Sequence, residues 1–228
     1  MNTVNDTYAP ILNNPTIIAT SKQICPSKKI RKFTLPKIFN YKISFHTFKL
    51  LKQSILQLAK SKKKRRNHCI LVKLLHNYAV INTKHFVFTI NFSGFVNITK
   101  LRKEEDIPKA ITLFCSLMKI SPVKYSYRID NITASGAFGA IIPLHKIKKH
   151  ISEFHSSEPL RFRFNPSYFC GGNIKFFKFG TIVLFESGSY TIVGPKTALQ
   201  VEHVYKETKR ILLPLLQTGE TCDHTSSK

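Results

Sequence analysis

The alternation of hydrophobic and polar residues is clearest toward the C-terminus, where it predicts a strand, a tight turn, a second strand and a helix. Residues 181–185 and 190–193 are rich in β-branched and aromatic side chains, which favour strands. The four residues between them include Gly188, which is free to adopt the positive φ of a tight turn. A helical stretch then continues to Pro214. On its own, this segment predicts a β-hairpin followed by a helix.

The same pattern occurs a second time, upstream. Residues 87–100 repeat the hairpin, and its Ser-Gly turn at Ser93 precedes the equivalent turn at Ser187 by ninety-four residues. A helix is predicted next, because acidic residues at 104–106 favour its positive end and Pro108 suits its first turn. The apolar stripe of this helix consists of Ile111, Phe114, Cys115 and Met118. The chain therefore contains an internal repeat.

The first copy of the repeat is the more degenerate one. It opens with a predicted strand at residues 39–45, and residues 69–75 form a buried-strand run that contains Lys73. Between them lies a predicted helix with one apolar face, formed by Phe48, Leu51, Ile55 and Leu58. We divide the chain into a disordered basic segment at 1–30, a first repeat at 31–120, a second repeat at 121–217 and a polar tail at 218–228.

Several motifs of the second copy resemble the TATA-binding protein family. The hairpin sequence Leu184-Phe-Glu-Ser-Gly188, the later Gly194-Pro-Lys196 and a last helix with a proline near its end match the family pattern. A strand around Asn131, a short helix begun by Pro143 and the segment 169–175 match it in the same order. The resemblance implies an α+β saddle, in which two pseudo-symmetric repeats form one curved antiparallel sheet with helices on its convex face.

The resemblance also implies a function and the residues that carry it. Members of this family bind the minor groove of AT-rich promoter DNA and bend it with apolar wedges, and they are themselves the standard example of this mode. The implied DNA wedges are Phe185 and Phe169, with Tyr168 as the competing choice for the loop position. The implied central base contacts are Asn131 and Asn40. The implied groove contacts are Thr99, Thr133, Val193 and Val183.

Two of these residues also fit simpler structural roles. Phe185 is an apolar residue in a predicted strand, and the alternation does not say whether it faces the core or the groove. Asn131 is of a residue type that commonly forms turns. Both alternatives stay open at the level of the sequence.

The first repeat departs from the family pattern at its wedge positions. These positions fall on Asn67 and Asn91, and only a one-residue slip of the strand would replace the second of them by Phe92. Lys42 stands where the groove face is apolar in the family, and Lys100 replaces a glycine. Because an asparagine does not unstack bases as a phenylalanine does, we expect a weaker and asymmetric kink in the DNA.

Basic residues are predicted to contact phosphates. The run Lys62-Lys-Lys-Arg-Arg66 falls on the loop that the resemblance assigns to the first repeat's stirrup, the hairpin at the outer end of each half-saddle. This run fits three roles, namely a nuclear-import signal, a set of phosphate contacts or a solvated charge run. The predicted phosphate contacts are Lys63, Lys64, Arg65, Arg66, Lys73, Arg102, Lys175 and Lys196.

The charge of the chain supports a polyanionic partner. The 36 lysines and arginines outnumber the 12 aspartates and glutamates, and the net charge is +24. No carboxylate occurs from Thr7 to Lys103, where twenty of these basic residues lie. Charge alone does not distinguish promoter recognition from non-specific packaging of nucleic acid. A third alternative is a protein-binding adaptor that keeps the fold but does not bend DNA.

Other classes of function find no support in the sequence. The five cysteines lack a Cys-x-x-Cys pair, and the nine histidines show no metal-ligand spacing. We therefore expect no enzyme activity, no cofactor and no metal, and an intracellular, reducing compartment. No apolar stretch approaches the length of a signal peptide or a membrane span.

We expect a monomer on DNA, acting in the nucleus or at a viral replication site with general transcription factors or RNA polymerase subunits. The lysine-, asparagine- and isoleucine-rich composition suggests a large DNA virus or a fast-evolving parasite.

Overall fold

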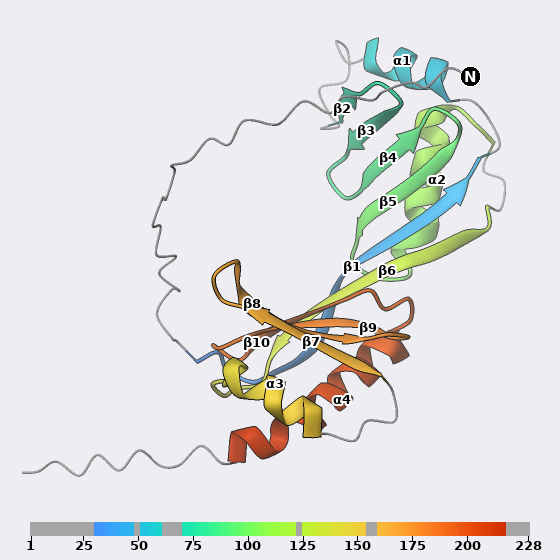
Figure 1. The fold of residues 1–228 in the computed structure, drawn as a ribbon. Coiled ribbons are helices and arrows are strands. Elements are labelled where there is room, and N and C mark those ends of the chain that lie inside the picture. The colour runs from blue at the N-terminus through green and yellow to red at the C-terminus, as the bar shows by residue number, and fades with distance from the viewer. Residues whose placement is uncertain (1–29, 48–50, 61–69, 122–124, 154–158, 218–228) are drawn as a thin grey trace, which may run out of the picture.

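A computed structural model of the chain describes residues 30–47, 51–60, 70–121, 125–153 and 159–217. In this part of the chain, one order of elements occurs twice: strand, helix, four strands, helix (Figure 1). The first repeat contains β1 (Thr34–His46), α1 (Lys52–Lys60), β2 (Leu71–Leu74), β3 (Tyr78–Asn82), β4 (Val87–Asn91), β5 (Phe95–Leu101) and α2 (Asp106–Met118). The second contains β6 (Tyr127–Ala137), α3 (Leu144–Glu153), β7 (Leu160–Asn165), β8 (Phe169–Phe176), β9 (Gly180–Phe185), β10 (Ser189–Val193) and α4 (Ala198–Gln217).

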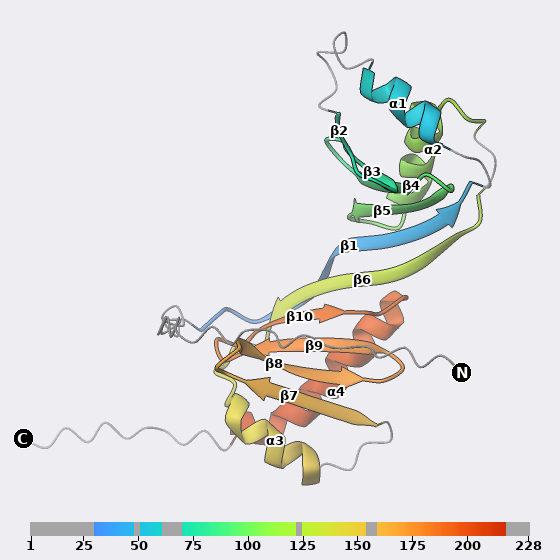
Figure 2. The ribbon, with the colours of Figure 1, turned by 45° about the horizontal axis from the view of Figure 1, so that its top comes forward.

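The ten strands form one open antiparallel sheet. Their order is β2-β3-β4-β5-β1-β6-β10-β9-β8-β7, so equivalent strands of the two repeats stand at equal distances from the centre. The two longest strands, β1 and β6, pair with each other there over most of their length. Figure 2 shows these two strands running from one repeat into the other. The order of strands thus has an approximate two-fold symmetry about the β1–β6 pair.

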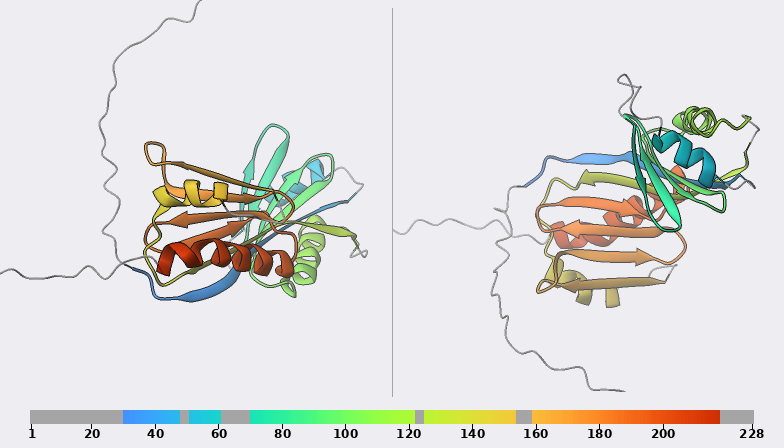
Figure 3. Two further views of the ribbon diagram at one scale, coloured as in Figure 1. Left: turned by 60° about the horizontal axis from the view of Figure 1, so that its bottom comes forward. Right: turned by 90° about the horizontal axis from the view of Figure 1, so that it is seen from above.

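The helices cover only one face of this sheet (Figure 3). In α2, buried residues recur at helical spacing, which gives the helix one apolar side. The ring of Phe114 in α2 meets that of Phe45 in β1 edge to face, with centroids 5.3 Å apart. In the second repeat, α4 packs against β9 and β10. No described helix packs on the opposite side of the strands, which we call the concave face. The broad α+β saddle expected from the sequence is therefore present.

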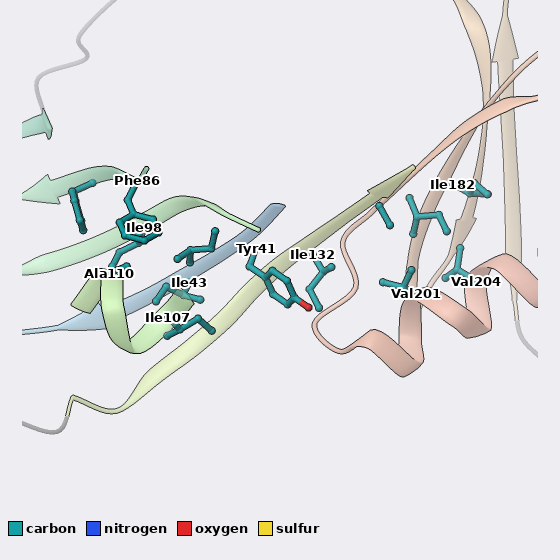
Figure 4. Close-up of a cluster of buried hydrophobic side chains, with 14 of the residues drawn as sticks. Tyr41, Ile43, Phe86, Ile98, Ile107, Ala110, Ile132, Ile182, Val201 and Val204 are labelled. Atoms are coloured by element: carbon teal, nitrogen blue, oxygen red, sulfur yellow. The ribbon is translucent and has the colours of Figure 1, made fainter. Parts of the chain in front are cut away.

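The two halves of the core meet where β1 and β6 cross. Tyr41 of β1 and Ile132 of β6 are register partners, and both side chains are buried. Figure 4 shows these two residues between the side chains of the first repeat and those of the second. Burial raises the pKa of the Tyr41 hydroxyl, and nearby Glu104 adds to the shift. The buried side chains form one continuous cluster through both repeats.

The structure corrects the predicted alignment of the first repeat. The hairpin between β2 and β3 has its turn at residues 75–77, so this turn, and not the run 62–66, is the equivalent of the β7–β8 turn. Lys73 accordingly lies on β2, before the hairpin, and not on the strand after it. Residues 69–75 form a short apolar run without a turn signal of its own, so the pattern fits either arm of a hairpin. This ambiguity caused the wrong alignment. Phe48, Asn67 and the run 62–66 lie outside the described residues.

The start of β1 differs from expectation, whereas the last helix includes its proline as expected. β1 begins at Thr34 and not at residue 39, because its first residues pair with the far end of β6. The helix α4 contains Pro214 and continues to Gln217. Proline removes one helical hydrogen bond, but the helix continues past it, and Leu212, two residues before the proline, is buried.

Two equivalent positions on the sheet have a positive φ, although only one of them is a glycine. Gly194 has a φ of 99°, and Lys100 has a φ of 65°. A side chain in this left-handed region costs roughly 1–2 kcal/mol, whereas glycine adopts it freely. We predict that Lys100→Gly raises the free energy of unfolding by roughly 1 kcal/mol, after allowing for the greater freedom of glycine in the unfolded chain.

Denaturant unfolding of the two variants Lys100→Gly and Lys103→Gly checks this prediction. Both changes remove one exposed positive charge, but Lys103 has no positive φ. The Lys103 variant should be neutral or less stable than the parent, because glycine loses more freedom on folding. An equal gain in both variants would mean that relief of charge repulsion, and not the backbone, is responsible.

Candidate nucleic-acid interface

The centre of the concave face carries two asparagines in equivalent positions. Asn40 Oδ1 accepts a hydrogen bond from the backbone N–H of Lys100 at 2.9 Å. Asn131 Oδ1 accepts one from the N–H of Gly194 at 2.5 Å. A backbone N–H only donates, so the atom facing it must be the side-chain carbonyl oxygen, and the NH₂ group lies on the other side. The alternative role of Asn131 in a turn is wrong, because it lies inside β6 and is held from the loop after β10.

The strands on either side of this centre present an uncharged surface. Residues Val87, Thr89, Asn97 and Thr99 line the concave face of β4 and β5. Their register equivalents are Thr181, Val183, Thr191 and Val193 on β9 and β10. The predicted groove contacts Thr99, Val183 and Val193 therefore lie in one layer, half-buried and with β-branched side chains. Thr133 lies on the same face and accepts a hydrogen bond at 3.0 Å from the Asn131 NH₂ group.

An aromatic pair stands at the outer end of the second repeat. The rings of Phe169 and Phe185 meet edge to face with centroids 5.9 Å apart. Gly171 pairs in register with Phe185 and provides the space for the pair: a Cβ there would come within 2.6 Å of the Phe169 ring. Phe185 is half-buried on the concave face, whereas the neighbouring Leu184 is fully buried on the other face. The alternative role of Phe185 in the core is therefore wrong. Tyr168 is 85% exposed in the adjacent turn and lies outside this ring pair.

The equivalent end of the first repeat has a different set of aromatics. The side chain of Asn91 is used by its own turn, because its Oδ1 accepts hydrogen bonds from the N–H and the Oγ of Ser93, both at 3.0 Å. Phe92 packs against the core, so the strand has not slipped by one residue. On either side of Asn91, however, Tyr78 and Phe95 are 41% and 39% exposed. Tyr78 is the register partner of Asn91 on the concave face. Sequence reasoning missed Tyr78 because it misplaced the β2–β3 hairpin. It passed over Phe95 although the hairpin that contains this residue was placed correctly.

Three cations gather at the outer edge of the second repeat. Arg161, Arg163 and Lys175 line a hollow of about 230 Å³ together with Asn173 and Thr181. Arg161 and Lys175 are register partners, which places like charges directly opposite each other and is unfavourable without an anion. No described carboxylate forms an ion pair with these three side chains. The signal for this cluster was present in the alternation Leu160-Arg-Phe-Arg-Phe164, which places both arginines on one face of a strand.

The other predicted phosphate contacts are spread over the two repeats. Lys73 is exposed on β2, opposite Val80, and is the equivalent of Arg163. Arg102 and Lys196 are both exposed and occupy equivalent positions, each two residues after a residue of positive φ. The described outer edge of the first repeat has Leu71 and Asn82 where the second has Arg161 and Lys175. Lys63, Lys64, Arg65 and Arg66 lie outside the described residues.

The described part of the chain shows no geometric sign of two other kinds of site. Three or more histidine, cysteine or acidic side chains come together nowhere in it as potential metal ligands. None of its helices combines the length and the apolar character that a membrane crossing requires.

The arrangement of one ten-stranded antiparallel sheet with a helix-free face and a twofold order of elements is that of the TATA-binding-protein-like saddle fold. No protein-family profile and no curated protein matches the sequence. Among solved structures, the TBP of the archaeon Methanococcus jannaschii matches this chain with a TM-score of 0.62. The match covers 79% of this chain and 99% of that one, at 17% sequence identity. At this identity the comparison shows that the two chains share a fold.

The close contacts of two neighbouring glycines give a test of the aromatic pair. A Cβ on Gly171 meets the mobile end of the exposed Phe169 side chain, whereas a Cβ on Gly172 meets Phe162 and the buried Leu144. We predict that Gly171→Ala changes the unfolding free energy by less than about 1 kcal/mol but abolishes the nuclear Overhauser contacts between the Phe169 and Phe185 rings. Gly172→Ala should keep those contacts and cost about 1–3 kcal/mol through overpacking. A Gly171→Ala protein with unchanged ring contacts contradicts the packing described above.

Proposed function

We propose that this protein binds duplex DNA on its concave face, in the minor groove of AT-rich sequence, and acts as a TATA-binding-protein-like initiation factor. The observation that carries the proposal is the layered composition of this face. Two asparagine amides stand at the centre, an uncharged β-branched surface flanks them, and aromatic and basic side chains stand at the outer ends. A minor groove has a matching order of base edges, sugar walls and phosphates.

The orientation of the two asparagines favours A·T over G·C pairs. In the minor groove, A·T pairs present only hydrogen-bond acceptors, whereas G·C pairs add the donor NH₂ group of guanine. Asn40 and Asn131 have their carbonyl oxygens engaged by backbone N–H groups, so each presents its NH₂ group as a donor, and in Asn131 one of the two N–H bonds already donates to Thr133. Donors match the acceptors of A·T pairs and meet a second donor at G·C pairs. The uncharged side chains of the flanking strands suit a groove floor that lacks charged groups, whereas Lys42, the register partner of Asn131, adds one positive charge at the centre.

The outer ends of the face fit a bent duplex. Apolar side chains that enter between base steps unstack them and kink DNA, a mode for which TATA-binding protein itself is the standard example. The Phe169–Phe185 pair supplies such side chains in the second repeat, and Tyr78 with Phe95 supplies rings in the first. Arg161, Arg163 and Lys175 would contact phosphates beside the second repeat, which also relieves their mutual repulsion.

The convex side of the saddle supports the proposed recruitment of transcription proteins. On α4, Leu199 is 76% exposed and Leu213 is 47% exposed, so apolar side chains are available there to a partner. General transcription factors or polymerase subunits are the partners that we propose. Work in the nucleus, or at a viral replication site, and the absence of enzymatic activity follow from this role and belong to the proposal.

Binding and bending of short duplexes test the proposal. At a fixed salt concentration, an AT-rich duplex should bind at least about tenfold more tightly than a GC-rich one, because each disfavoured pair costs ~1–3 kcal/mol. Fluorescence transfer between dyes at the two ends should report bending of the AT-rich duplex alone. Phe185→Ala should remove much of this bend, whereas Leu199→Ala on the convex side should leave it unchanged.

The remaining outcomes separate the alternatives. Equal affinity for both duplexes without bending would contradict promoter recognition and favour a nucleic-acid packaging protein. No binding to either duplex, in spite of the net charge of +24, would favour a protein-binding adaptor on the same fold.

Two exposed tyrosines test the contribution of the first repeat to the bend. Tyr78 and Tyr127 are 41% and 42% exposed, but Tyr127 pairs with the core residue Phe45 and so belongs to the helix side of the sheet. We predict that Tyr78→Ala lowers the end-to-end fluorescence transfer of the bound AT-rich duplex, and that Phe95→Ala in addition lowers it further. Tyr127→Ala should have no effect on the transfer. If Tyr78→Ala leaves the bend at its original size, the first repeat takes no part in it.

A further inference from the structure

Residues 30–37 approach the sheet in the second repeat, although they belong to the first repeat in the sequence. The N-terminal end of β1 pairs with the C-terminal end of β6, where Thr34 is the register partner of Ala137. Before this strand, the N–H of Arg31 donates a hydrogen bond at 3.2 Å to the carbonyl oxygen of Ser187 in the β9–β10 turn. The segment is thus held across the end of β6, close to the turn that follows Phe185.

A groove of about 1220 Å³ lies between this segment and the concave face of the second repeat. Its lining includes three exposed cations from the N-terminal side, Arg31, Lys32 and Lys37. On the sheet side it includes Phe185 of the aromatic pair and the hydroxyl-bearing side chains of Ser189 and Thr191. Glu186 is the single carboxylate among the described lining residues. The groove is therefore basic on one wall and opens onto the aromatic pair on the other.

We propose that Arg31, Lys32 and Lys37 bind phosphates of the same duplex that reaches Phe185, and so extend the DNA interface from the sheet onto the N-terminal segment. This proposal rests on the proposed function, because it takes the duplex on the concave face as given. Phe185 lines the same groove as the three cations, so a strand that contacts its ring passes beside them. Lysine and arginine side chains bind phosphate oxygens with charge-assisted hydrogen bonds.

Charge complementarity selects nucleic acid as the occupant over other partners. Arg161, Arg163 and Lys175 lie on the same face of the second repeat, and no described carboxylate neutralises them. Along the order of strands in the sheet, these three cations lie on one side of the aromatic pair, and the three cations of the N-terminal segment lie on the other side. Positive charge therefore flanks the aromatic pair. A duplex carries phosphates on both sides of its minor groove and so matches this arrangement. An extended acidic peptide carries its charges along a single line and does not match it.

The salt dependence of binding measures this contact. The double variant Arg31→Ala/Lys32→Ala and the control Lys148→Ala/Lys209→Ala each remove two exposed positive charges. The control residues lie on α3 and α4, on the helix side of the sheet. The affinity of the full-length protein for one AT-rich duplex, extended by about one helical turn (~10 bp) beyond the bent site at each end, is measured from low to moderate salt. Thermal melting confirms that each variant is folded.

Each phosphate contact contributes ~0.9 to the slope of log affinity against log salt concentration. The Arg31/Lys32 variant should therefore lose up to about 2 from the steepness of this slope and bind several-fold more weakly at low salt, with a further loss on adding Lys37→Ala. The control variant should lose clearly less. An N-terminal variant that matches the parent or the control in slope and affinity overturns this inference while leaving the proposed function intact. A parent protein that binds no duplex overturns both.

Discussion

The antiparallel pairing of β1 with β6 is the interaction on which the rest of the structure depends. These strands join the two repeats into one sheet, and their partners Tyr41 and Ile132 join the two halves of the core. The same pairing places Asn40 opposite Thr133 and Lys42 opposite Asn131, so it also assembles the centre of the candidate interface. Each asparagine is held by a backbone N–H at the end of the last strand of its own repeat, Lys100 in β5 for Asn40 and Gly194 just after β10 for Asn131. Strand pairing and side-chain orientation are therefore set together.

On this symmetric scaffold the two halves of the concave face have diverged. The second repeat has two phenylalanines over a glycine and three cations at its edge, whereas the first has Tyr78 and Phe95 around a turn-forming Asn91. The buried face of each strand must pack against helices, and substitutions there carry a cost in cavities or overpacking. The exposed face has no such constraint, so the fold persists at 17% identity to an archaeal TBP while the surface differs between the repeats.

Carboxylates are scarce in this chain, which explains why basic side chains of the concave face lack acidic partners. The ion pairs of the described chain are local, as in Lys206 with Glu202 and Arg210 with Glu207 on α4, and Lys109 with Asp106 on α2. Acidic groups are thus used mainly on the helix side. The cations of β7 and β8 have no described carboxylate partner and stand opposite each other across the strands, which is unfavourable for like charges.

The sequence by itself determined the internal repeat, the two Ser-Gly hairpins and the helices after them. These features follow from local turn chemistry and hydrophobic periodicity, which act over a few residues. Only the tertiary structure decided which face Phe185 takes, which arm of a hairpin carries Lys73, and that Tyr78, Arg161 and Arg163 lie on the concave face. Alternation shows that a strand has two faces, but the helix that covers one of them, and the register that places a residue beside its partner, come from distant parts of the chain.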